Sequence, residues 1–266
     1  MCKYELGFIG CGNMGGALAT AAAQVVDPKK IAVCDFDTEK VKNMENSCGV
    51  VGSTAQDIAQ NARFVVLAVK PQAMETAISG FAKELQARKD VTVVTMAAGL
   101  SIAAMRGYIG ADLPTIRIMP NTPALLGAGM ILYALANVNE TEEQAFLSAF
   151  SKAGVFDKLP EEAIDAGSAL SGCGPAFVYA FIQALADGGI TCGVDPDKAL
   201  LYAAQTAKGA AEMLLKYGDS KTLIKNVCSP GGTTIEGVKT LEAENLSGVV
   251  VDAVKASYKR TLELKK

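Results

Sequence analysis

Histidine is absent from this chain of 266 residues. The absence excludes imidazole as a general acid or base, so a proton needed in any reaction must come from another residue or from water. A metal site is not expected either, because imidazole ligands are missing and no two cysteines stand at Cys-x-x-Cys spacing. The odd set of seven cysteines predicts free thiols in a reducing cytosol: Cys2, Cys11, Cys34, Cys48, Cys173, Cys192 and Cys228.

A large excess of charge of either sign is also lacking. The net charge is -3, the pI is about 5.2, and the lysines are scattered. Neither nucleic acid nor a membrane is therefore expected as a partner. The mean hydropathy is +0.25, yet apolar stretches such as 176–186 are too short for a membrane span. Lys3 and Glu5 interrupt the start of the chain, which argues against a signal peptide and favours a cytoplasmic protein.

Up to about residue 160, short apolar runs alternate with helical patterns. Strands are predicted at residues 4–10, 30–34, 64–69, 91–96, 115–119, 130–136 and 154–159. Helices are predicted at residues 13–26, 38–46 and 141–152, with Pro71 in the first turn of another and Ser101 as the N-cap of a short one. The alternation predicts an α/β fold with a doubly wound parallel sheet.

The character of the sequence changes near residue 160. Helical spacing continues at residues 175–190, 196–217, 220–227, 234–244 and 248–264, with almost no strand signal. We therefore expect an α/β domain at 1–160 and an all-α domain at 161–266. Several of these helices are rich in Ala, Leu and Val with few charges, so they need burial on more than one face. Helices shared between subunits would provide it, which predicts a homodimer or an assembly of dimers.

A glycine-rich loop joins the first predicted strand to the first predicted helix. Gly10, Gly12 and Gly15 fit the G-x-G-x-x-G fingerprint of Rossmann-type dinucleotide-binding domains, with Cys11 at the second position of the loop. The segment continues through Asn13 and Met14 into the helix, whose N-terminus presents N–H groups to a diphosphate. A glycine-lined packing turn that binds nothing is the alternative. The strand before and the helix after favour a nicotinamide dinucleotide site.

Asp35 follows the second strand at the spacing of the acidic residue that binds the adenosine ribose. A carboxylate accepts hydrogen bonds from both ribose hydroxyls but repels a 2′-phosphate, so Asp35 favours NADH over NADPH. No arginine follows it, and Lys40 and Lys42 are the nearest cations. The alternative is that Asp35 or Asp37 caps the helix that begins near Thr38.

The motifs resemble those of the pyrroline-5-carboxylate reductases nearly from end to end. They are Phe8-Ile9-Gly10-Cys11-Gly12-Asn13-Met14-Gly15, Ala68-Val69-Lys70-Pro71-Gln72, Met119-Pro120-Asn121-Thr122-Pro123, Ser171-Gly172-Cys173-Gly174-Pro175-Ala176, Ala186-Asp187-Gly188-Gly189 and Ser229-Pro230-Gly231-Gly232-Thr233-Thr234. The first is shared with hydroxyisobutyrate and phosphogluconate dehydrogenases, whereas the last is close to the family's own signature. The resemblance implies an enzyme that reduces 1-pyrroline-5-carboxylate to L-proline with NADPH or NADH, the last step of proline biosynthesis.

Two positions depart from the family pattern. The family usually has serine where Cys173 stands, which is an exchange of one small residue for another. It commonly has small hydroxyl residues where Asp35 and Asp37 stand, which suits NADPH. The family pattern thus favours NADPH, while the carboxylates of this chain favour NADH.

The substrate is expected at the start of a helix in the second domain. The candidate residues are Ser229, Gly231, Gly232, Thr233 and Thr234. Unobstructed backbone N–H groups and the helix N-terminus would attract the substrate carboxylate. Thr234 matches the family threonine near the imine nitrogen, where its hydroxyl would donate or accept a hydrogen bond. An ordinary turn with a threonine N-cap is the alternative.

Further cofactor contacts are expected at the carboxyl ends of strands, where ligands bind in doubly wound sheets. The candidates are Ala68, Val69, Lys70, Pro71 and Asn121. Alternatively, Lys70 is a surface lysine and Asn121 belongs to a structural proline turn. The segment 171–176 lies beside the substrate or lets two helices pack closely, and the sequence leaves both open.

Two other functions fit parts of the sequence. A hydroxyacid dehydrogenase would need a catalytic lysine after the glycine-rich helix start at 171–176, but the next turns carry Tyr179 and Gln183, and no lysine precedes Lys198. A regulatory protein that senses the nucleotide without turnover would have no use for the substrate anchor at 229–234. Both therefore rank below the reductase.

Overall fold

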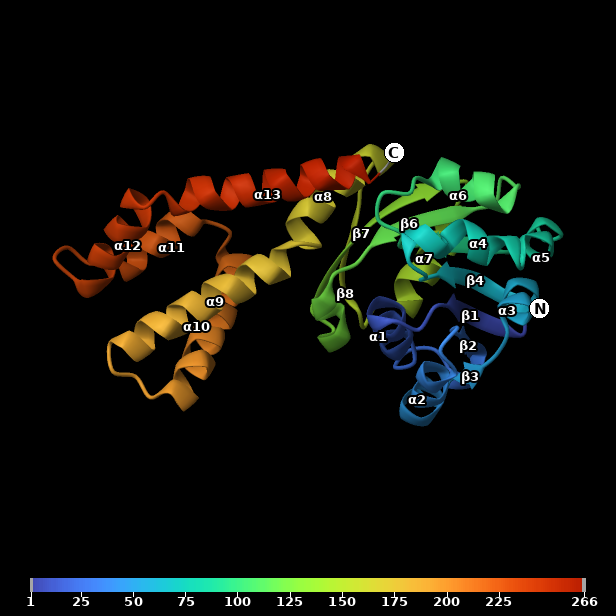
Figure 1. Cartoon of the computed structure of the whole chain (residues 1–266), viewed down its shortest axis with the longest axis horizontal. Coiled ribbons are helices and arrows are strands. Elements are labelled where there is room, and N and C mark those ends of the chain that lie inside the picture. The colour runs from blue at the N-terminus through green and yellow to red at the C-terminus, as the bar shows by residue number, and fades with distance from the viewer. Residues whose placement is uncertain (1, 265–266) are drawn as a thin grey trace. The chain divides into compact units, whose positions relative to one another are not determined.

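The computed structural model describes residues 2–264, which form two compact units (Figure 1). One unit runs up to Cys173 and includes the segment that begins at Ser257, and the other is Gly174–Ala256. The predicted boundary near 160 coincides with the start of helix α8 (Glu161–Ser171), which packs on strand β7 of the first unit. The division of the chain into domains at 160 stays a prediction.

An eight-stranded sheet forms the first unit, in the order β3-β2-β1-β4-β5-β6-β7-β8. Its strands are β1 (Tyr4–Ile9), β2 (Ile31–Cys34), β3 (Val51–Gly52), β4 (Ala62–Leu67), β5 (Thr92–Thr95), β6 (Thr115–Met119), β7 (Gly129–Ala136) and β8 (Gly154–Lys158). The order reverses direction between β1 and β4, as in doubly wound folds. The expected fold class is thereby confirmed.

One strand pair departs from the predicted parallel sheet. β7 runs antiparallel to β6, and β8 then runs parallel to β7. The loop 120–128 between β6 and β7 holds only the short 3₁₀ helix η3 (Thr122–Leu126). A parallel return needs a crossover of about a dozen residues or more, usually a helix, so this connection is too short for one.

Helices cover both faces of the sheet. They are α1 (Asn13–Ala22), α2 (Thr38–Cys48), α3 (Ala55–Asn61), α4 (Met74–Ser79), α5 (Ala82–Gln86), α6 (Ile102–Ile109), α7 (Glu140–Ala149) and α8, with short 3₁₀ helices η1 (Pro28–Lys30) and η2 (Pro71–Ala73). Ser101 is the N-cap of α6, as predicted, and its Oγ accepts from the Ala104 N–H at 3.1 Å. Pro71 begins η2 rather than an α-helix. Helix α1 ends four residues before the predicted limit at 26.

Side chains of the central strands alternate between two apolar layers. Phe8 and Phe64 are buried in one layer, together with Phe146 of α7. Ile9 and Val65 are buried in the other. Because both faces are covered, β1 and β4 are apolar along most of their length, which explains why they read as continuous apolar runs.

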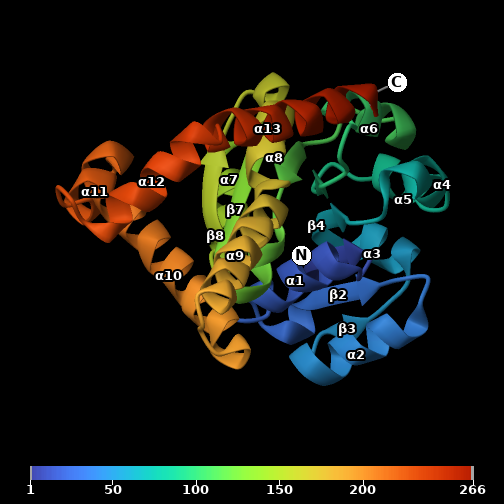
Figure 2. The same cartoon turned by 60° about the vertical axis from the view of Figure 1, so that its left-hand side comes forward.

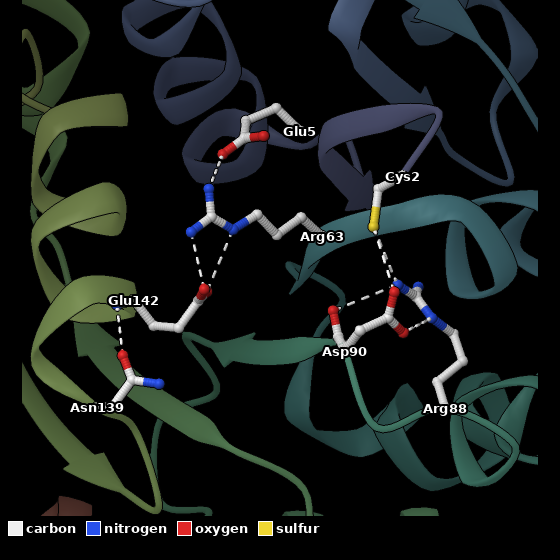
Figure 3. Close-up of polar contacts among 7 residues, drawn as sticks. All are labelled: Cys2, Glu5, Arg63, Arg88, Asp90, Asn139 and Glu142. Atoms are coloured by element: carbon white, nitrogen blue, oxygen red, sulfur yellow. Dashed lines mark hydrogen bonds and ion pairs between the residues drawn. The ribbon is translucent and has the colours of Figure 1, made fainter.

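Polar side chains form a network at the end of the sheet where strands β1 and β4 begin (Figure 3). Arg63 Nη1 donates to Glu5 Oε1 at 2.8 Å, and Nη2 donates to Glu142 Oε1 at 2.7 Å. Beside it, Arg88 Nη1 donates to the carbonyl oxygen of Ala62 at 2.6 Å and Nε donates to Asp90 Oδ1 at 3.0 Å. These contacts tie α7 and the segment between α5 and β5 to the sheet.

The second unit is helical. It contains α9 (Gly174–Thr191), α10 (Pro196–Tyr217), α11 (Ser220–Val227), α12 (Thr233–Ala243) and the part of α13 (Leu246–Glu263) up to Ala256. Helices α9 and α10 lie side by side, as Figure 2 shows, around a small cluster of buried alanines, Ala186, Ala199 and Ala203. The predicted helices of this region are confirmed to within two residues at each end.

Large apolar side chains of this unit are exposed. They include Val178, Tyr179, Phe181, Leu200, Leu201, Tyr202, Leu215, Val227, Val249, Val250 and Val251. The stretch Glu161–Thr191, which spans α8 and α9, also contains an 18-residue window with a mean hydropathy of 1.4, which is long and apolar enough to cross a membrane. Its α8 part lies on the sheet with Ile164 and Ala169 buried.

Candidate functional site

The glycine-rich loop connects β1 to α1, and each of its three glycines meets a different steric demand. Gly10 has φ +107°, and a Cβ there would lie 2.7 Å from the backbone of Ala68. At Gly15 a Cβ would overlap the Gly10 carbonyl oxygen and lie 2.9 Å from Ala68 Cβ. At Gly12 a Cβ would meet nothing within 4 Å, so its backbone faces open space. Gly10 thus permits the tight turn, Gly15 the close packing of helix and strand, and Gly12 the free approach of a pyrophosphate, as expected of a loop that binds a dinucleotide.

The N-terminus of α1 is available to an anion. Its N-cap is Gly12, no side chain caps it, and its first turn carries no acidic residue. The backbone N–H groups of Met14 and Gly15, the second and third residues of the helix, therefore lack the partner that a Ser, Thr or Asp cap provides elsewhere in this chain. The arrangement fits a diphosphate, because such an N-terminus carries about half a positive charge.

A cleft of about 770 Å³ opens where β1, β2 and β4 end. It lies at the point where the strand order reverses, the position of ligand sites in doubly wound sheets. Six predicted cofactor residues line it: Gly10, Gly12, Asp35, Ala68, Val69 and Lys70. The other predicted residues, Cys11, Asn13, Met14, Gly15, Pro71 and Asn121, are not among its lining residues.

Asp35 closes the cleft at the end of β2, and its side chain is 14% exposed. Its Oδ2 accepts from the Cys11 N–H at 2.6 Å, and its Oδ1 accepts from the Asp37 N–H at 2.9 Å. Lys40 Nζ lies 3.9 Å from Oδ1. Asp37 is the N-cap of α2 and accepts from the Glu39 N–H, so the capping alternative holds for Asp37 and not for Asp35.

Sequence reasoning missed several lining residues of the cleft. Phe36 lies between the two aspartates with its side chain fully exposed, at 105%. Ser53 and Thr54 follow β3, a two-residue strand whose pattern is too short to predict. The position of Phe36 directly after Asp35 was the available signal, because that segment must border the adenosine half of the site.

Two thiols beside the loop are held protonated. Burial, reinforced by the negative charge of Asp35, raises the pKa of Cys11 to about 12. Burial and the same carboxylate raise the pKa of Cys34 to about 11. Neither sulfur is a thiolate near neutral pH, so both act as small apolar groups, which agrees with the sequence interpretation of Cys11.

Asn121 fastens three segments of the first unit. Its Nδ2 donates to the Ser171 carbonyl oxygen at 2.9 Å, and its Oδ1 accepts from the Met130 N–H at 2.9 Å. Both polar groups of the buried amide are thus used within the fold. The side chain therefore joins the end of β6 to β7 and to the end of α8, while a role of its backbone toward the cofactor stays a prediction.

The predicted substrate anchor lies in the second unit. Gly231 has φ +70°, and the Gly232 N–H donates to the Ser229 carbonyl oxygen at 3.0 Å. Helix α12 begins at Thr233 with Gly232 as its N-cap and no side-chain cap. A threonine N-cap, the alternative for this motif, is therefore wrong. The loop leaves backbone N–H groups of the first turn without a capping side chain.

Comparison with known proteins extends over the whole chain. Residues 161–264 match the model of pyrroline-5-carboxylate reductase dimerisation, and residues 5–99 match the NADP oxidoreductase, coenzyme F420-dependent, model. The chain is 36% identical to pyrroline-5-carboxylate reductase of Escherichia coli, with 99% of both chains covered. It belongs to the pyrroline-5-carboxylate reductase family.

Solved structures agree with this assignment. The structure of pyrroline-5-carboxylate reductase from Coxiella burnetii superposes with a TM-score of 0.91 at 31% identity and covers 99% of each chain. That of Plasmodium falciparum pyrroline carboxylate reductase, which has NADP bound, superposes with a TM-score of 0.88 at 28% identity and covers 100% of each chain. As a member of the family, the chain is an oxidoreductase with a Rossmann-type domain, and its C-terminal region is of the kind through which reductases of this family associate.

Proposed function

We propose that the chain reduces 1-pyrroline-5-carboxylate to L-proline with NADH or NADPH. The observation that supports this function is the cleft at the ends of β1, β2 and β4, which borders the open backbone of Gly12 and the uncapped N-terminus of α1. The chain that forms this cleft matches pyrroline-5-carboxylate reductases over its full length. The reaction makes it the last enzyme of proline biosynthesis.

Residues that line the cleft and their neighbours in the chain hold the dinucleotide by two kinds of contact. Gly10, Cys11, Gly12, Asn13, Met14 and Gly15 form the diphosphate cradle, and Asp35 binds the adenosine ribose. Ala68, Val69, Lys70, Pro71 and Asn121 lie after β4 and β6, at the ends of strands, and border the nicotinamide half. Reduced nicotinamide, when bound, supplies a hydride to the imine carbon.

The chain contributes positioning rather than a strong acid. The substrate carboxylate binds at the N-terminus of α12, through the N–H groups of Gly231 and Thr233 on either side of Gly232 and through the hydroxyl of Ser229. The Gly232 N–H itself donates to the Ser229 carbonyl oxygen and holds the loop. The Thr234 hydroxyl forms a hydrogen bond with the imine nitrogen. A cyclic imine that arrives protonated needs no further acid, which agrees with a chain that lacks histidine. Holding the two reactants in attack geometry supplies up to about 7–11 kcal/mol of the barrier reduction.

A homodimer, or an assembly of dimers, is the second part of the proposal. The exposed apolar residues of α9, α10 and α13 support it, because a patch of this kind on a chain that carries a dimerisation region calls for a partner. The α9 part of the apolar stretch Glu161–Thr191 has the same explanation. We place the enzyme in the cytoplasm, without nucleic-acid or membrane partners, on the basis of its free thiols and acidic pI.

Turnover tests the proposed reaction directly. The protein is mixed with 1-pyrroline-5-carboxylate and either NADH or NADPH, and loss of the reduced nicotinamide absorbance is followed together with proline formation. We expect one proline for each nicotinamide oxidised. A hydroxyacid with the oxidised cofactors is the control substrate and should give no signal. Binding of cofactor without turnover would contradict the reductase and favour a nucleotide-sensing protein.

A further inference from the structure

The segment Asp35–Asp37 presents two carboxylates and one aromatic ring to the end of the cleft beyond β2. All three residues line the cleft. Asp35 is mostly buried, with its side chain 14% exposed, whereas Asp37 is 50% exposed. This end is separated from Lys70, which follows β4, by the intervening strand β1. A dinucleotide whose diphosphate lies on α1 would place its adenosine here.

The Asp35 carboxylate has a fixed orientation and spare acceptor capacity. Backbone N–H groups of Cys11 and Asp37 each donate to one of its oxygens, at 2.6 Å and 2.9 Å. A carboxylate offers about four acceptor sites, so about two remain. A ribose 2′,3′-diol supplies two donors, whereas a 2′-phosphate supplies oxygens that carry negative charge. The first fits the remaining sites, and the second does not.

Lys40, the cation near this segment, already lies close to two carboxylates. Lys40 Nζ lies 3.9 Å from Asp35 Oδ1 and 3.8 Å from Asp37 Oδ2. Of the described residues that line the cleft, the cations are Lys40 and Lys70, and arginine is not among them. One lysine shared by two carboxylates leaves net negative charge where a 2′-phosphate would sit. An arginine, which binds phosphate through two parallel hydrogen bonds, would be the usual solution there.

Phe36 supplies a flat apolar surface at the same end. Its side chain is fully exposed and lines the cleft, so it contributes little to the core of the fold. Aromatic rings of this kind stack on nucleobases with little dependence on the identity of the base. An adenine ring would cover it.

We infer that the segment Asp35–Asp37 selects NADH over NADPH: Asp35 binds the ribose diol while holding the glycine-rich loop, Asp37 repels a 2′-phosphate, and Phe36 stacks on adenine. The inference rests on the proposed function of the cleft as a dinucleotide site. It assigns Asp35 two tasks, because the same carboxylate that faces the ribose also accepts from the loop at Cys11.

Equilibrium binding tests the inference without reference to turnover. Dissociation constants of NADH and NADPH are measured by nicotinamide fluorescence, which is free of tryptophan emission because the chain has no tryptophan. Adenosine 5′-monophosphate and adenosine 2′,5′-bisphosphate are then compared by calorimetry. We expect NADH and the monophosphate to bind at least about ten-fold tighter, because a 2′-phosphate would meet two carboxylates of like charge. Ten-fold corresponds to about 1.4 kcal/mol.

Three variants separate the tasks. Asp37→Ser keeps an N-cap on α2 and should tighten NADPH several-fold while NADH stays unchanged. Asp35→Asn keeps one acceptor oxygen for the Cys11 N–H, gives up the bond from the Asp37 N–H, and should weaken NADH while NADPH gains. Phe36→Ala should weaken both cofactors by the same factor. Asp27→Ser, at another aspartate N-cap that is not among the cleft residues, is the matched control and should change neither.

The outcomes are distinct. Equal affinity for the two cofactors, or tighter NADPH, in the unaltered protein would overturn the inference and leave the dinucleotide site intact. Unchanged constants in Asp35→Asn and Asp37→Ser would overturn it as well. Failure of all four nucleotides to bind would overturn the proposed function of the cleft itself.

Discussion

Thr234 stands in the first turn of α12, after a loop whose backbone turns sharply at Gly231. A hydroxyl is too weak an acid to protonate an imine on its own. It can still orient the nitrogen by a hydrogen bond, and a bond to a charged group contributes about 1.5–3 kcal/mol. The role proposed for Thr234 is therefore positioning at the reacting nitrogen, and its size is measurable.

Replacing Thr234 with Ala should lower kcat/KM for 1-pyrroline-5-carboxylate by roughly ten- to a hundred-fold, the kinetic equivalent of that hydrogen bond. Thr234→Ser should restore most of the loss because it restores the hydroxyl. Thr240→Ala, at an exposed threonine of the same helix whose Oγ1 donates to the Glu236 carbonyl oxygen, is the control. Unchanged kcat and KM in Thr234→Ala would remove this hydroxyl from the mechanism.

At the scale of elements, β6 and the loop that follows it hold α8 in place. Arg117, which is 1% exposed, donates from Nη2 to Asp165 Oδ1 at 2.6 Å and from Nη1 to Glu161 Oε1 at 3.3 Å. At the other end of the helix, the Asn121 amide donates to the Ser171 carbonyl oxygen. Helix α8, which precedes the second unit in the chain, is therefore bound to the sheet by side-chain hydrogen bonds.

Arg117→Met should lower the free energy of unfolding by about 3–5 kcal/mol, because it leaves the buried Asp165 carboxylate without its guanidinium partner. Denaturant unfolding followed by circular dichroism measures the change. Arg63→Met is the matched control, since Arg63 also pairs with two carboxylates but its side chain is 29% exposed. That control should cost about 1 kcal/mol or less. Equal losses in the two variants would contradict the special role of the buried pair.

At the scale of the whole molecule, the second unit does not bury its own apolar surface. Its buried cluster consists of small residues, whereas large apolar side chains such as Leu201 and Leu215 are 65% and 89% exposed. Both residues lie on α10 at a spacing that places them on nearly the same face of the helix. An exposed apolar surface of this size is typical of an interface between chains, which is why we propose a dimer.

The double variant Leu201→Glu with Leu215→Glu should convert the oligomer to monomers or block its assembly, because two charges would have to enter an apolar interface. Light scattering coupled to size exclusion measures the mass. Leu126→Glu is the control, since Leu126 is 90% exposed in the first unit. A monomeric mass for the unaltered protein would contradict the proposed dimer.

The periodic spacing of apolar residues predicted most of the helices and strands, because these elements are long enough to show a period. The strand 115–119 and the helix 196–217 were predicted at their observed limits. Short elements escaped: β3 has two residues, and α3 and α5 lie in polar stretches without a clear period. Helix α1 ends at Ala22, and the residues after it form tighter turns in which the N–H groups of Gln24 and Val25 donate to the carbonyl oxygens three residues earlier.

The sequence by itself determined the order of strands and helices, the glycine-rich loop and the family motifs, since these depend on residues close together in the chain. Only the tertiary structure decided that the Asp35 carboxylate meets the Cys11 N–H, 24 positions away, and that Phe36 borders the same cleft. It also decided that β7 runs antiparallel to β6. The same holds for the Asn121 amide, whose two hydrogen bonds go to the backbone of Ser171 and Met130. Contacts of this kind arise when packing brings distant segments together, and no local period encodes them.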